Sequence, residues 1–132
     1  MATLTGTLTL VSTDAFTHQP ISISTNKALA VEAPYTDLSR VAAPIGSDKE
    51  LHPASGSDVL YFFVRNTGIQ ASNGASVAHT VTVKNASGQA IGTLGAGEFL
   101  FIPVTAGAGL EVRTTSGAAV FVEYLYFTKD VS

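Results

Sequence analysis

The three histidines are the first residues to consider for metal binding or acid–base chemistry. His18, His52 and His79 share neither the HxH nor the HExxH spacing, in which one strand or helix presents both rings to a single ion. His18 and His52 lie close to prolines in predicted loops, which indicates surface histidines. His79 falls on the apolar face of a predicted strand, which favours a buried, hydrogen-bonded side chain over a ligand. We therefore predict no metal site.

Among the acidic residues, Glu123 stands out because its neighbours in residues 120–127 are apolar. A carboxylate in such surroundings must find a partner or remain neutral. The basic residues on other predicted strands are Arg65, Arg113 and Lys84, and we predict a structural ion pair with one of them. No pair of acidic residues has a spacing that suggests glycosidase chemistry.

Nucleophile and nucleotide-binding motifs are also missing from the sequence. It has no cysteine, no GxSxG and no P-loop pattern. The glycine-containing stretch 95–99 precedes a predicted strand instead of a helix, so it does not form a phosphate cradle. We predict a protein that is not an enzyme, with no catalytic residue and no cofactor.

The composition restricts the classes of partner. In 132 residues only 13% are charged, and the net charge is −3. The seven basic residues are scattered, which argues against nucleic acid and anionic membranes. The lack of cysteine, together with a start that has neither the basic region nor the apolar run of a signal peptide, favours synthesis in the cytoplasm. The weakly charged surface suits a subunit that packs against other subunits.

Alternating apolar and polar residues define the elements. Residues 3–10 alternate threonine with leucine or glycine, which predicts a half-buried strand with a threonine outer face. Glycine-containing turns separate most of the later apolar runs. Counting these segments gives about eight strands, the number expected for an antiparallel jelly-roll β-sandwich. The remaining predicted strands are 21–24, 59–65, 77–84, 90–94, 99–104, 110–115 and 119–127.

Two stretches lack a clear strand pattern. Residues 26–58 contain three prolines, and we predict a long loop excursion that is a possible docking region. Within it, residues 36–41 fit either one helical turn or a loop. Residues 66–75 are predicted to be a polar surface loop. The whole chain, 1–132, is predicted to be a single domain.

Three strands carry apolar side chains on both faces: 58–65, 98–104 and 120–127. A sandwich has only one inner face per sheet, so their outer faces need a second cover. Either another subunit provides it or residues 26–57 fold over the sheet. We favour a homo-oligomer, with a trimer as the preferred state. The candidate residues of an oligomer or partner interface are Leu4, Leu8, Tyr35, Leu38, Tyr61, Phe63, Phe99, Phe101, Tyr124 and Tyr126.

Residues 94–110 resemble the turn–strand–turn stretch of cupin-type jelly rolls. Cupins hold a metal with histidine and glutamate side chains inside the barrel. In this sequence Leu110 stands where the resemblance would require a histidine, and Ala78-His79-Thr80 is the nearest approach to an HxH pair. A degenerate cupin-like enzyme is therefore only a third alternative.

Four segments together resemble small jelly-roll virion proteins of tailed bacteriophages, especially capsid decoration (cement) proteins. They are MATLTGTLTL (1–10), TVTVKNASG (80–88), GAGEFLFIP (95–103) and AVFVEYLYF (119–127). The resemblance implies a non-enzymatic protein on the capsid surface, often trimeric, that binds the major capsid protein or another virion protein. The N-terminal strand or the segment 26–58 would then face the capsid. The alternative is a carbohydrate-binding or receptor-binding β-sandwich module of a head fibre or tail tip, for which Tyr35 and Asn73 offer a poor platform.

Overall fold

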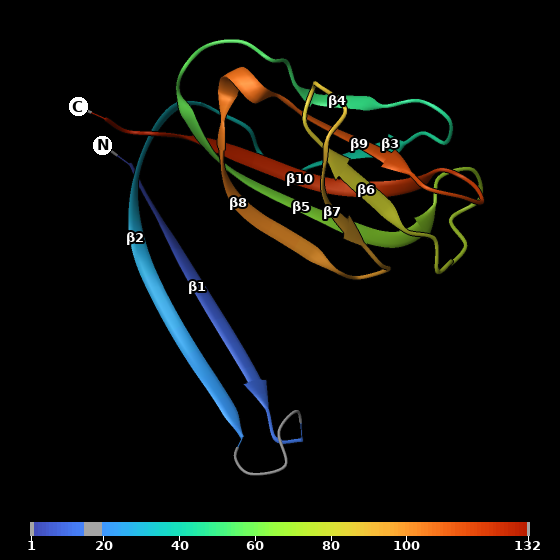
Figure 1. Cartoon of the computed structure of the whole chain (residues 1–132), viewed down its shortest axis with the longest axis horizontal. Coiled ribbons are helices and arrows are strands. Elements are labelled where there is room, and N and C mark those ends of the chain that lie inside the picture. Colours follow the sequence, from blue (N-terminus) through green and yellow to red (C-terminus); the bar gives the residue numbers. More distant parts are fainter. Residues whose placement is uncertain (1, 15–19, 132) are drawn as a thin grey trace. The chain divides into compact units, whose positions relative to one another are not determined.

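The computed structural model describes residues 2–14 and 20–131, and within them the chain is almost entirely β (Figure 1). It divides into two compact units, residues 1–32 with 129–132 and residues 33–128. The predicted all-β, antiparallel sandwich is confirmed. The elements are β1 (Ala2–Ser12), β2 (Ile21–Tyr35), β3 (Ser39–Ala43), β4 (Lys49–His52), β5 (Val59–Gln70), β6 (Val81–Lys84), β7 (Ala90–Leu94), β8 (Phe99–Thr105), a 3-10 turn (Ala106–Ala108), β9 (Leu110–Thr114) and β10 (Val120–Lys129).

The second unit, residues 33–128, contains two antiparallel sheets. One has the order β3-β10-β5-β8, and the other has the order β4-β9-β6-β7. The eight strands pair in a nested manner: β3 with β10, β4 with β9, β5 with β8, and β6 with β7. The innermost hairpin, β6–β7, turns at Asn85–Gly88, where Gly88 adopts a φ of 88° that favours glycine.

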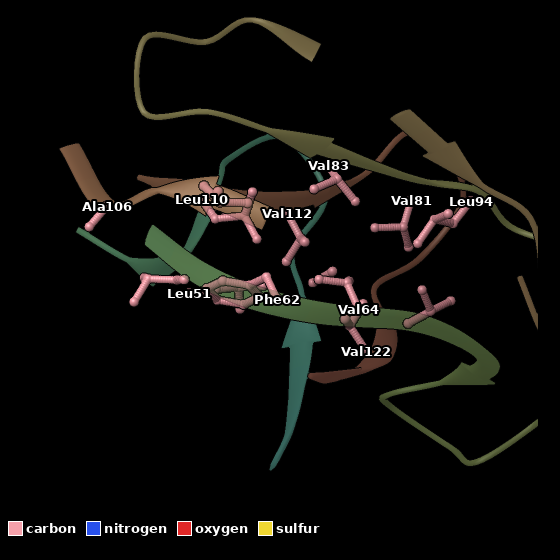
Figure 2. Close-up of a cluster of buried hydrophobic side chains, with 14 residues drawn as sticks. Leu51, Phe62, Val64, Val81, Val83, Leu94, Ala106, Leu110, Val112 and Val122 are labelled. Atoms are coloured by element: carbon pink, nitrogen blue, oxygen red, sulfur yellow. The ribbon is translucent and has the colours of Figure 1, made fainter. Parts of the chain in front are cut away.

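The hydrophobic core lies between these two sheets. Phe62 and Val64 on β5 point toward Val83 on β6 and Val112 on β9, and each of the four is fully buried (Figure 2). These residues occupy alternate positions of their strands, so one face of each strand supplies the core.

The three strands predicted to be apolar on both faces are neighbours in one sheet, in the order β10-β5-β8. Their inner faces carry side chains such as Phe62 and Val122, which belong to the core. Their outer faces carry the intervening residues, such as Phe63 and Leu125, which are registered opposite each other. The sequence alternation therefore assigned both faces of this sheet correctly.

The predicted loop excursion over residues 26–58 is wrong. β2 continues to Tyr35, β3 pairs with β10, and β4 pairs with β9. Residues 36–41 include the first residues of β3 and form no helical turn. The prediction treated the prolines as signs of a loop, but proline is also tolerated at strand ends and edges. Pro44 directly follows β3, and Pro53 directly follows β4. β3 and β4 extend the sheets at their edges instead of folding over the outer face.

Two further boundaries differ from the sequence prediction. β5 continues through Gln70, so the first half of the predicted polar loop 66–75 is strand. Conversely, the strand predicted for 77–84 begins only at Val81. Asn66 explains the first difference, since its fully buried side chain bonds to backbone groups inside the sandwich instead of water.

In the first unit, β1 and β2 form a long antiparallel hairpin. Their register runs without a break from Ala2 opposite Val31 to Ser12 opposite Ile21. Leu10 and Ile23 face each other on the apolar side, yet their side chains are 50% and 49% exposed. The alternation predicted for residues 3–10 is confirmed, whereas the expected half-burial is wrong, because most residues of β1 are exposed.

Candidate docking surface

The outer face of β10, β5 and β8 carries the largest group of aromatic side chains on the second unit. Register places Phe127 opposite Tyr61, and places Leu125, Phe63 and Phe101 in one row. We call this surface the aromatic face. It consists of Tyr35, Tyr61, Phe63, Phe99, Phe101, Phe121, Leu125 and Phe127.

The rings of the aromatic face pack against one another across strands. Phe63 and Phe99 have ring centroids 6.3 Å apart, and Tyr61 and Phe101 have centroids 6.4 Å apart. Tyr35, from the end of β2, stacks on Phe127 at 5.5 Å. Such cross-strand aromatic contacts are favourable and fix the ring orientations. The face is therefore an ordered platform.

Much of this platform remains open to solvent. Phe99 is 60% exposed, Phe101 43% and Tyr35 54%, whereas Tyr61 on the same face is only 7% exposed. Exposed large apolar side chains gathered on one sheet face are typical of interaction sites. The need for a second cover, predicted from the sequence, is therefore not met by residues 36–58, which contribute strands to the sheet edges.

A network of ion pairs borders the aromatic rings. Glu123 on β10 lies 3.5 Å from Arg40 on β3 and 3.3 Å from Arg65 on β5, measured between carboxylate oxygens and guanidinium nitrogens. Arg40 also lies over the ring of Phe121, at 5.4 Å from its centroid. The predicted pairing of Glu123 with a basic residue is confirmed with Arg65.

The two other predicted partners of Glu123 lie elsewhere. Arg113 and Lys84 both pair with Asp48, at 2.8 Å and 3.2 Å. Arg40, Arg65 and Glu123 therefore form a separate group of charges at the border of the aromatic face. Aromatic residues and arginine are the side chains most enriched at protein–protein contacts. The arrangement can remove apolar rings from water and offer guanidinium donors at the rim.

Five of the ten candidate interface residues lie together on the aromatic face: Tyr35, Tyr61, Phe63, Phe99 and Phe101. Leu38 is exposed in the connection between β2 and β3. Leu4 and Leu8 belong to β1 in the first unit.

The remaining two candidates, Tyr124 and Tyr126, lie on the opposite side of the sheet. Both stack on Phe62 and pack against the core. Sequence reasoning omitted Phe127, Arg40 and Arg65 from the candidate set. The alternation in the sequence could have identified Phe127, because consecutive residues of a strand point to opposite faces and Tyr126 points to the core.

The histidines occupy three separate environments. His52, at the end of β4, makes a T-shaped contact with Tyr126, with ring centroids 5.4 Å apart. His79 is half-buried in the segment before β6, against Gly117, so its predicted place on a strand face is wrong. That error arose because alternation continues from 77 to 84 although pairing begins only at Val81. His18 lies outside the described residues.

Within the described residues, no group of three histidine, aspartate or glutamate side chains is placed to hold a metal ion. Leu110, at the position where the cupin resemblance would require a histidine, is fully buried in the core. Over the same residues, no helix is long and apolar enough to cross a membrane. No protein-family model and no curated protein matches the sequence.

Proposed function

We propose that this chain is a non-enzymatic virion structural protein, a capsid decoration protein that binds the outside of an assembled tailed-bacteriophage shell. The observation that carries the proposal is the aromatic face, an ordered and exposed apolar surface bordered by Arg40 and Arg65. Such a surface is suited to burial against another protein.

The strand order of the second unit supports the jelly-roll part of the proposal. In a jelly roll, a long antiparallel ribbon of eight strands is rolled so that the first strand pairs with the last, and so on inward. The pairs β3–β10, β4–β9, β5–β8 and β6–β7 follow this scheme. Each sheet then receives both strands of every second pair: β3–β10 and β5–β8 form one sheet, and β4–β9 and β6–β7 form the other.

A decoration protein acts through binding alone. A ligand that binds only the assembled shell adds its binding free energy to the stability of the shell by mass action. Repetition over many equivalent sites makes moderate individual contacts effective. The major capsid protein is the proposed partner, and the low charge of the chain, 13% of residues, suits close packing among subunits in a homotrimer.

The test is binding to shells of the encoding virus that were assembled without this protein. The variant Phe99→Ser with Phe101→Ser removes the two most exposed rings of β8. The matched control Ile91→Ser removes an exposed apolar side chain of β7, in the other sheet. We expect co-sedimentation with shells for the wild type and the control. For the double variant we expect the affinity for shells to fall by at least about 30-fold, since even one aromatic anchor contributes about 2 kcal/mol or more at a binding hot spot.

Shell binding that survives the double substitution would contradict the use of the aromatic face. A wild-type chain that does not bind shells would contradict the decoration role. The alternative of a carbohydrate-binding or receptor-binding module makes a different prediction for the same variants. A glycan-array signal that is lost with Phe99→Ser and Phe101→Ser would replace the capsid proposal, because exposed rings also stack on sugars.

A further inference from the structure

The outer edge of β1 lacks the features that normally protect a strand edge. Among the described residues β1 pairs only with β2, and it ends the strand order of its sheet. Its eleven residues, Ala2–Ser12, contain no proline and no charged side chain, and the register shows no bulge. Natural edges use such devices to prevent pairing with another chain. An edge this long without them is suited to receive another strand.

The central seven residues around Gly6 in β1 form a palindrome. Residues Thr3–Thr9 read Thr-Leu-Thr-Gly-Thr-Leu-Thr in both directions. If this strand pairs antiparallel with a second copy, centred on Gly6, each residue meets its own type: threonine opposite threonine, leucine opposite leucine, glycine opposite glycine. Directly opposed residues in an antiparallel pair lie on the same face of the sheet. The apolar and threonine faces of the two copies therefore coincide.

We propose that β1 pairs antiparallel with β1 of a second copy of this chain, related by a two-fold axis at Gly6. The pairing places four strands side by side in the order β2-β1-β1-β2. A two-fold contact requires a patch that is complementary to itself, and a palindromic strand meets this requirement. The occupant that fits this edge best is thus the chain itself. The inference concerns the first unit and does not depend on capsid binding by the aromatic face.

The low stability of an isolated hairpin favours this pairing, and charge repulsion does not prevent it. A two-stranded hairpin is marginally stable in water, whereas three or more strands with an apolar face are stable. Lys27, opposite Gly6, is the charged residue at the centre of the hairpin. Across these four strands the two copies of Lys27 would be three strand spacings apart, roughly 14 Å. This separation exceeds the Debye length of about 8–10 Å, so their repulsion is largely screened.

A disulfide tests the register directly. The chain has no cysteine, so Gly6→Cys introduces a single thiol that the two-fold axis places next to its twin. The control Thr9→Cys puts its thiol opposite Thr3 of the second copy, and about 20 Å from its twin along the strand. Under mild oxidation we expect Gly6→Cys to form a covalent pair of chains and Thr9→Cys to remain unlinked. Equal linking of both variants, or none with Gly6→Cys, would overturn the proposal.

A second test compares two charged variants at the same positions. Thr5 of one copy lies opposite Thr7 of the other. Thr5→Lys with Thr7→Lys therefore opposes like charges, and Thr5→Lys with Thr7→Glu opposes unlike charges. By light scattering we expect an even number of chains for the wild type, half that mass for the double lysine variant, and the wild-type mass for the lysine–glutamate variant. If the chain also forms a trimer through another surface, pairing through β1 joins two trimers, and the number of chains in the particle is still even. An odd number of wild-type chains, or one mass for both variants, would refute the pairing.

Discussion

At the scale of single residues, Asn66 links the two sheets of the second unit. Its side-chain nitrogen donates to the carbonyl oxygens of His79 and Leu94, at 2.9 Å each. Its side-chain oxygen accepts from the backbone nitrogen of Gly68 at 2.9 Å. All three contacts are shielded by the complete burial of Asn66. A buried polar group with this many partners is stabilising only while each partner stays satisfied.

The variant Asn66→Asp tests this role, because a carboxylate cannot donate to the two carbonyl oxygens. We expect the free energy of unfolding to fall by about 3 kcal/mol or more, from two lost donors and a buried charge. Chemical denaturation gives this value from the shifted midpoint. The control is Asn73→Asp, an exposed residue whose side-chain oxygen accepts from Ala75, as a carboxylate also can. Equal stability of the two variants would contradict the role of Asn66.

The same scale shows what sequence can and cannot predict. The ion pair of Glu123 with Arg65 followed from one rule, that an acid among apolar neighbours needs a base. Asn66 was placed in a surface loop because Asn-Thr-Gly has the local signature of a turn. Its partners His79 and Leu94 are 13 and 28 residues away. A local sequence pattern cannot predict hydrogen-bond partners that are so far away along the chain.

At the scale of elements, alternation and glycine turns located the strands from β7 to β10 to within two residues. The predicted 90–94 coincides with β7, and 99–104 and 110–115 differ from β8 and β9 by one residue. The same rules failed between 26 and 58. β3 and β4 are five and four residues long, and prolines follow both, so neither shows enough alternation to be recognised. Their strand character comes from pairing with β10 and β9.

Asp48, just before β4, forms ion pairs that tie this short strand to its sheet. Its carboxylate pairs with Arg113 on β9 and Lys84 on β6. We expect Asp48→Asn to lower the free energy of unfolding by about 1 kcal/mol, because the three side chains are partly exposed and screened by water. The loss should shrink in 1 M salt, where the Debye length is about 3 Å.

The matched control for this element is Asp58→Asn, an exposed residue before β5. Its substitution should change stability by less than about 0.5 kcal/mol. Thermal or chemical unfolding of the two variants, at low and high salt, separates the ion pairs from a general charge effect. A salt-independent loss for Asp48→Asn would indicate that the ion pairs do not hold β4.

At the scale of the whole molecule, the two units differ in how they bury apolar surface. Every member of the core cluster lies within residues 43–122 of the second unit. The hairpin of the first unit buries little, since most residues of β1 and β2 are exposed. A unit with a core can fold alone, whereas a hairpin with exposed leucines gains most from pairing. The alternation of residues 3–10 predicted a strand correctly, but it could not reveal how little of that strand is buried.

A chain that begins at Ala33 tests this division of roles. We expect it to fold and to unfold cooperatively in denaturant, because it retains the complete core cluster. It should also lose the pairing through β1, so light scattering should give half as many chains per particle as for the full-length protein. Binding to shells should persist per chain, since all residues of the aromatic face lie after Ala33. An unfolded truncated chain would contradict the independence of the second unit, and an unchanged number of chains per particle would assign the assembly to a surface other than β1.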